Sequence, residues 1–194
     1  LMQKAVLAGD VPGVVVTAGD RNGTLFEAGF GDRRIGTAER MTPDTVVWIA
    51  SMTKAVVAAG AMRLVEQGRL SLDLPAAEVL PALGQVPVLE GFDADGQARL
   101  RQARRPMTLR HLLTHTSGFG YDTWNAEIMR FMKLKGLPRV GTCRNEALGI
   151  PLLFDPGNAW CYGIGIDWAG KMVEAVTGMR LGAYLRQNLF APLG

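Results

Sequence analysis

The chain has 194 residues, 48% of them hydrophobic and 20% charged, which is typical of a globular domain with a buried core. A net charge of +3, without a stripe of Lys and Arg interleaved with aromatic residues, argues against a nucleic-acid partner. Two cysteines and two histidines cannot supply a disulfide framework or a four-ligand zinc site, and no run approaches the ~20 apolar residues of a membrane span, so we expect no metal, no cofactor and no membrane span.

Residues 13–31 predict a β-hairpin. Two apolar runs, residues 14–18 and 24–28, flank Arg21-Asn22-Gly23, and an Asn-Gly pair between such runs is a strong hairpin signal because both positions tolerate positive φ. A lone hairpin is marginal in water, so this one should belong to a larger antiparallel sheet. No later segment reads convincingly as a strand. We therefore assign residues 1–40 to the sheet and residues 41–194 to a mainly helical region.

The helical region should begin with a buried helix from Ser51 to Gly68. This stretch is rich in Ala and Met and apolar on nearly every side, which predicts burial all round, and Gly68 suits its C-terminal end. Such an environment is costly for Lys54 unless the lysine has a partner or a function.

Prolines interrupt the middle of the chain, and the arginine run from 99 to 105 reads as a solvated loop. Beyond it the sequence indicates four more helices, the first with Thr108 as N-cap and Gly118 as its terminator. These helices are expected over residues 108–115, 123–134, 165–178 and 181–189.

Ser51 and Lys54 form a Ser-x-x-Lys pattern at the start of the helix predicted from Ser51 to Gly68. The i, i+3 spacing stacks hydroxyl and amine on one face, and the helix N-terminus favours developing negative charge. An amine in apolar surroundings should lose its proton more readily and act as a base. On its own the pattern is weak, because Ser and Lys at this spacing are more often a cap and a solvated side chain.

Tyr162 is the second candidate, since a phenol near an ammonium can carry protons between nucleophile and leaving group. A core tyrosine with a satisfied hydroxyl is the ordinary alternative. A Ser117–His115 pair could instead begin a Ser/His/Asp triad, but neighbours two residues apart on a short turn face apart.

Several segments, in one order over nearly the whole chain, resemble the family of serine β-lactamases and penicillin-binding proteins. Residues 45–54 and 67–73 resemble its nucleophile region, in the form found in class C β-lactamases, D-alanyl-D-alanine peptidases and family VIII carboxylesterases. Residues 111–119 are similar to its Leu-Leu-x-His-Thr-Ser-Gly segment, residues 154–163 to its tyrosine loop, and residues 190–194 to a usual helix end.

The resemblance implies an α+β fold of the β-lactamase type and a serine hydrolase. Ser51 would be the acylated nucleophile, Lys54 its base or hydrogen-bond partner, and Tyr162 the proton shuttle. The backbone N–H of Ser51 would form half of an oxyanion hole. His115 and residues 116–118 are expected to be structural, as in the family.

The tyrosine loop departs from the β-lactamase pattern at Ile164, where those enzymes usually carry the Asn of Tyr-x-Asn. With Asp167 a few residues on, the segment is closer to the carboxylesterase branch, and Ile164 suggests an apolar pocket. We therefore expect a small-molecule ester with a short acyl chain as substrate. The residues predicted to bind it are Phe119, Trp160, Gly163 and Ile164.

The family's C-terminal half, with its remaining strands and its Lys-Thr-Gly or Trp-x-Gly-Gly strand, has no counterpart after Gly178. We expect that half to complete the site and residues 1–194 alone to be inactive. A β-lactamase, a peptidase or acyltransferase, and a non-catalytic binding member stay open as alternatives. The start has no secretory layout, which favours a cytoplasmic over a periplasmic or secreted location, with a removed signal peptide as the alternative.

Overall fold

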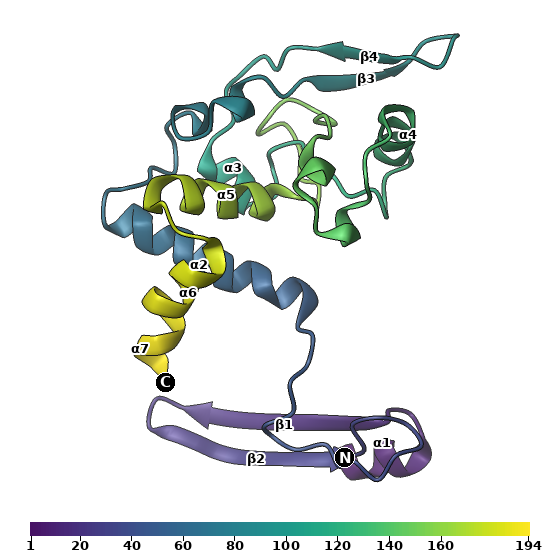
Figure 1. Ribbon diagram of the computed structural model, residues 1–194, viewed down its shortest axis with the longest axis vertical. Helices are drawn as coiled ribbons and strands as arrows, with labels where there is room; N and C mark the ends of the chain where they lie inside the picture. Colours follow the sequence, from purple (N-terminus) through teal and green to yellow (C-terminus); the bar gives the residue numbers. More distant parts are fainter. The chain divides into compact units, whose positions relative to one another are not determined.

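The computed structural model describes all 194 residues and divides into two compact units, Leu1–Ala50 and Ser51–Gly194. The chain folds into short helices and two small antiparallel sheets (Figure 1). None of its helices has the length and apolar character needed to cross a bilayer.

The first unit contains the predicted hairpin, which is confirmed. Helix α1 (Met2–Ala8) precedes strands β1 (Gly13–Asp20) and β2 (Gly23–Gly31), which pair antiparallel. The pairing of Asp20 with Gly23 makes Arg21 and Asn22 the two loop residues, one position earlier than an Asn-Gly loop. The Asp20 carboxylate accepts the Asn22 N–H at 2.7 Å and fixes this turn. No residue of this unit is buried, so the hairpin has no core of its own.

Helix α2 (Thr53–Glu66) opens the second unit, preceded by a 3-10 turn over Ala50–Met52. Helices α5 (Gly165–Thr177) and α6 (Leu181–Leu185) pack on it. Its buried residues lie on one face and are Val57, Gly60, Ala61 and Leu64. The prediction of burial all round is wrong, because α5 and α6 leave other sides of α2 open, and both Met52 and Met62 are exposed.

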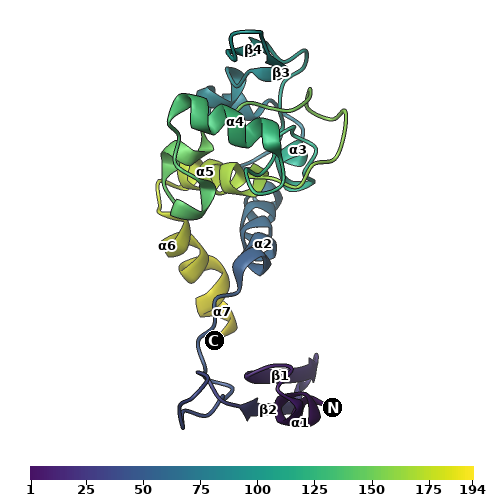
Figure 2. The same ribbon diagram turned by 90° about the vertical axis from the view of Figure 1, so that its right-hand side faces the viewer.

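One continuous core fills the second unit. Helix α5 packs on both α2 and α3 (Leu109–Leu113), and the three helices lie next to one another in both views (Figures 1 and 2). Gly60 lets α6 approach closely, since a Cβ there would lie 2.7 Å from the Leu185 side chain. Fully buried members of this core include Leu64, Leu109, Leu112, Phe119, Ile128, Ile164, Met172 and Val173.

A second hairpin, which the sequence did not predict, occupies the middle region. Strands β3 (Val88–Phe92) and β4 (Ala98–Arg101) pair antiparallel and form a sheet separate from β1–β2. The solvated-loop prediction is therefore wrong for the start of the arginine run. Arg101 sits in β4 because its guanidinium has carboxylate partners, Glu90 at 3.0 Å and Asp155 at 2.8 Å.

The four later helices are confirmed, with shifted ends. Helix α4 (Ala126–Lys135) starts later than predicted because the Asn125 side chain caps it by accepting the Ile128 N–H at 2.9 Å. Helix α5 ends at Gly178 as expected. Helix α6 runs on through a π-helical stretch, Arg186–Phe190, into α7 (Ala191–Leu193), where Pro192 lies in the first turn and is tolerated.

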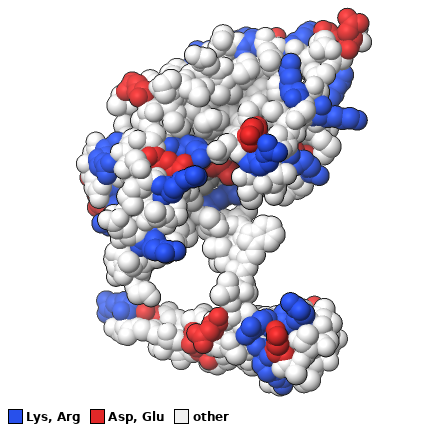
Figure 3. Space-filling model, viewed as in Figure 1, with Lys and Arg blue, Asp and Glu red and all other residues white.

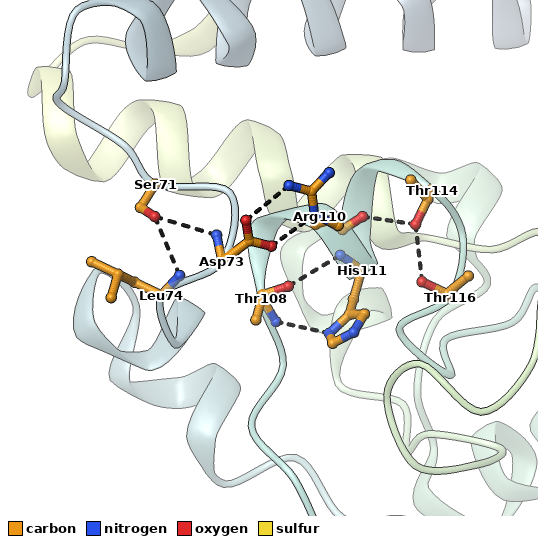
Figure 4. Close-up of polar contacts among 8 residues, drawn as sticks. All are labelled: Ser71, Asp73, Leu74, Thr108, Arg110, His111, Thr114 and Thr116. Carbon is orange, nitrogen blue, oxygen red and sulfur yellow. Dashed lines mark hydrogen bonds and ion pairs between the residues drawn. The ribbon is translucent and has the colours of Figure 1, made fainter.

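Helix α3 is short, and a network of polar side chains stabilises it (Figure 4). The Thr108 hydroxyl accepts the His111 N–H, and the His111 ring accepts the Thr108 N–H, so the two residues cap each other. Arg110 makes two hydrogen bonds to Asp73, at 2.7 and 2.8 Å. His111 thus has a structural task in the predicted N-cap.

On the face drawn in Figure 3, basic and acidic side chains are interspersed rather than gathered into one stripe.

Candidate active site

The structure brings Ser51 and Lys54 together as the spacing predicts. Ser51 lies in the turn that leads into α2, and Lys54 Nζ donates a hydrogen bond to Ser51 Oγ at 3.2 Å. Ala50, the residue before Ser51, has φ 45°, a left-handed conformation that is unfavourable for a residue with a Cβ. Strain of this kind is characteristic of functional turns.

Tyr162 joins this pair from a loop far away in the sequence. Lys54 Nζ lies 4.9 Å from the centre of the Tyr162 ring. The loop is fixed by a hydrogen bond from Cys161 N–H to the His115 carbonyl at 2.8 Å. Gly163 allows the closest approach, because a Cβ at this position would lie 2.2 Å from the Phe119 carbonyl oxygen. The three predicted catalytic side chains are therefore neighbours.

A second phenol, Tyr121, faces the same amine and was missed by sequence reasoning. Lys54 Nζ lies 5.4 Å from the centre of its ring, and the rings of Tyr121 and Tyr162 are 5.5 Å apart. Nothing in the sequence marks Tyr121, which follows the Gly-Phe-Gly segment without a motif of its own. Only the fold of this loop places it beside Lys54.

Further aromatic rings surround Tyr162. Trp124 lies 5.6 Å from it, Trp160 6.4 Å and His115 4.7 Å, measured between ring centres. Trp124 is 71% exposed and Trp160 67% exposed. The reacting groups therefore border an open aromatic surface that an apolar ligand could contact.

The electrostatics of Lys54 differ from the sequence expectation. Burial lowers the pKa of Lys54, but hydrogen bonding to the phenols of Tyr121 and Tyr162 outweighs this, and the net pKa is raised. The expectation of a proton-poor amine is therefore wrong, because the phenol oxygens favour the ammonium. At neutral pH Lys54 carries its charge.

The pKa values of the two phenols are shifted in opposite directions. Hydrogen bonding to Ser51, followed by hydrogen bonding and charge attraction from Lys54, lowers the pKa of Tyr162. Burial raises the pKa of Tyr121 more than Lys54 lowers it. The two environments therefore drive the pKa values of the two phenols apart.

Two other titratable groups face the amine. Desolvation and the nearby charge of Lys54 lower the pKa of His115, so its ring is neutral at neutral pH. Desolvation raises the pKa of Asp167, while attraction to Lys54 lowers it. His115 also has φ 58°, the second strained residue next to the reacting groups. No set of three or more His, Cys, Asp or Glu side chains is arranged to hold a metal ion.

The predicted substrate-binding residues divide into two groups. Trp160 is exposed next to Tyr162, in a position to contact a ligand. The side chains of Phe119 and Ile164 are 0% exposed and pack in the core. Gly163 is buried in the close contact described above. Of the four residues, Trp160 is therefore the one whose side chain is open to a ligand.

Several known proteins are similar to this chain. The Beta-lactamase family model matches residues 1–194. Monacolin J acid methylbutanoyltransferase of Aspergillus terreus is 41% identical, over 99% of this chain and 48% of its own length. Lovastatin esterase of Penicillium rubens is 36% identical, over 99% of this chain and 49% of its own length.

Unliganded simvastatin synthase from Aspergillus terreus has a similar structure, with a TM-score of 0.87 at 40% identity, covering 100% of this chain and 51% of that one. The chain thus spans about half the length of the curated relatives it matches. Those relatives are acyltransferases and esterases on a β-lactamase-like fold. The chain belongs to the beta-lactamase family, as its motif order predicts.

Proposed function

We propose that the protein containing this chain transfers acyl groups from small carboxylic esters through an acyl-enzyme on Ser51. The observation that carries this proposal is the position of Lys54, whose ammonium donates to the Ser51 hydroxyl and lies against the Tyr162 phenol. The esterase and acyltransferase relatives support the reaction class.

The directions of the pKa shifts support a division of labour. Tyr162, as phenolate, accepts the Ser51 proton, and the Lys54 ammonium stabilises the phenolate throughout. The Ser51 oxygen attacks the ester carbonyl, and the backbone N–H of Ser51 donates to the resulting oxyanion. Tyr162 then gives its proton to the departing alcohol, leaving the acyl group on Ser51. Water or a second alcohol reverses these steps and releases the acid or a new ester.

The remaining half of the protein would complete the site. We expect it to supply a second oxyanion donor and a further pocket wall, because the chain spans only about half the length of its curated relatives. The first unit has no buried residue, and its apolar Leu25 and Phe26 are exposed. We expect strands of the remaining half to pair with its hairpin. We therefore expect residues 1–194 alone to be inactive.

Hydrolysis and transfer share every step up to the acyl-enzyme and differ only in the acceptor. The open aromatic surface at Trp124 and Trp160 favours an apolar aryl or alkyl ester. The name of the 41% identical transferase suggests a short, branched acyl group. We place ester hydrolysis first, with transfer to an alcohol as the second function. A β-lactam or D-alanyl peptide substrate ranks below both, because Ile164 stands where the Tyr-x-Asn pattern of those enzymes has its Asn.

A fluorophosphonate probe tests the nucleophile in the full-length protein. The wild type and a Ser71→Ala control should be labelled, whereas Ser51→Ala should not. Ser71 is the matched control, since its hydroxyl accepts N–H bonds from Asp73 and Leu74 and has no contact with Lys54. Labelling of Ser51→Ala at the wild-type rate would refute the proposal.

Substrate choice is tested separately. Initial rates on p-nitrophenyl butyrate should exceed those on nitrocefin, and added alcohol should divert part of the acyl group into a new ester. A preference for nitrocefin would move the protein to the β-lactamase branch.

A further inference from the structure

Lys54 lies against two phenols, and the reaction proposed above uses only one of them. The second, Tyr121, lies nearly as close to the amine as Tyr162 does. Its ring centre is 5.4 Å from Nζ, compared with 4.9 Å for Tyr162. We propose that Tyr121 is a positioning residue, whose hydroxyl holds the Lys54 ammonium between Ser51 and Tyr162. This inference rests on the proposed function.

Tyr121 is itself held from several directions. Its carbonyl accepts the N–H groups of Trp124 at 3.3 Å and Asn125 at 3.1 Å, in the turn that leads into α4. The next residue, Asp122, is buried and paired with Arg139 at 2.7 Å. The Trp124 indole meets the Tyr121 ring edge to face, with centres 5.7 Å apart. Tyr121 thus presents its phenol from a fixed backbone.

A lysine needs such help because its ammonium ends a flexible four-carbon stem and has three N–H donors to satisfy. One of them is used by Ser51. The other neighbours of the amine are Tyr121 and Tyr162, whose ring centres lie 5.4 and 4.9 Å from Nζ. With all three in place, Nζ has one position and lies next to both groups between which the Ser51 proton moves.

The two phenols are not interchangeable. Burial keeps Tyr121 in its neutral form and raises its pKa, whereas the pKa of Tyr162 is lowered. Tyr121 is therefore a holder of Lys54 and not a second base. The charged and titratable groups that face the amine are Tyr121, Tyr162, His115 and Asp167.

The chain contains three tyrosines, which gives a matched series of Tyr→Phe variants in the full-length protein. The third, Tyr184, donates to the Gly60 carbonyl at 3.1 Å, in the middle of α2 and not at the end that carries Lys54. It serves as the control for losing a buried hydroxyl. The measurement is the rate of Ser51 phosphonylation by a fluorophosphonate as a function of pH, followed by intact mass.

Tyr121→Phe should slow phosphonylation by about tenfold, the effect of one hydrogen bond to a charged group. It should also move the alkaline limb of the profile to lower pH, because one interaction that favours the ammonium is lost. Tyr184→Phe should leave that limb in place. A Tyr121→Phe profile that is merely lower at every pH, or unchanged, would overturn the positioning role.

Tyr162→Phe separates the two proposals. If it is strongly impaired while Tyr121→Phe behaves as the wild type, only the positioning role fails. If Tyr162→Phe retains the wild-type rate and profile, the proposed reaction itself is wrong.

Discussion

The charged side chains of Asp155 and Lys54, both in the second unit, have different kinds of partner. Asp155 is buried against Arg101, with hydrogen bonds of 2.8 and 2.9 Å, and also accepts the Arg104 N–H at 2.8 Å. Lys54 takes part in none of the ion pairs, and its neighbours are the Ser51 hydroxyl and the rings of Tyr121 and Tyr162.

The difference separates structural groups from reactive ones. A carboxylate saturated by a guanidinium is locked in one protonation state and fixes the loop that carries it. An ammonium surrounded by hydroxyls leaves groups beside it that can exchange protons at modest cost. Substitutions at Asp155 should therefore affect stability, and substitutions at Lys54 should affect rate.

The largest effect is expected for Lys54→Met, which keeps the length of the side chain and removes its charge. Acylation of Ser51 by p-nitrophenyl butyrate should fall about a thousandfold, within the range of acid–base catalysis. The Tm should stay unchanged or rise, because a partly desolvated charge is replaced by an apolar group. A variant with much lower Tm and a nearly normal rate would place Lys54 among the structural groups.

Asp155→Asn should show the reverse pattern. Arg101 loses its buried carboxylate, so we expect the Tm to fall by roughly 5 °C, while the acylation rate of the folded protein changes by less than tenfold. Thermal unfolding and a rate measured well below the transition test this. An unchanged Tm would show that the pair does not hold the tyrosine loop.

The same carboxylate predicts a pH dependence of stability. Hydrogen bonding to Arg101 and to the Arg104 backbone lowers the pKa of Asp155 from 3.8 to about 2. A folded-state pKa below the unfolded value adds stability that is complete above the unfolded pKa and is lost as pH falls toward the folded one. Urea unfolding between pH 5 and 2 should show a steeper loss in the wild type than in Asp155→Asn. Parallel curves would contradict this assignment.

The smallest effect is expected for Thr108→Ala, at the N-cap of α3. Losing the hydroxyl that accepts the His111 N–H should lower the free energy of unfolding by about 1 kcal/mol, the usual cost of an N-cap. Thr114→Ala, at the other end of α3, is the comparison, since its exposed hydroxyl caps no backbone N–H and bonds only the Arg110 carbonyl and the Thr116 hydroxyl. Denaturant unfolding of both variants measures the difference.

Local sequence patterns predicted much of the fold. The first hairpin, the Thr108 cap and the Gly178 end of α5 follow from turn and cap residues within a few positions of one another. The β3–β4 hairpin could not be predicted in this way, because Arg101 is stabilised in a strand by Glu90 and by the distant Asp155. Burial of α2 was overestimated for a similar reason, since it depends on which elements cover the helix.

The candidate site was predictable to the extent that it follows motifs. Ser51 and Lys54 are fixed by helical spacing, and Tyr162 by its resemblance to the tyrosine loop. Tyr121 has neither signal and is placed by the turn before α4. The charge of Lys54 was misjudged because burial alone favours a neutral amine, and the opposing phenols are visible only in three dimensions.

Trapping the covalent intermediate tests the central claim most directly. Full-length protein is mixed with p-nitrophenyl butyrate, quenched in acid within the first turnovers, and mapped by peptide mass spectrometry. We predict a butyryl group on Ser51 that is absent in Ser51→Ala and present in Ser71→Ala. Steady hydrolysis without an acylated peptide, or with the acyl group on another residue, would contradict the account.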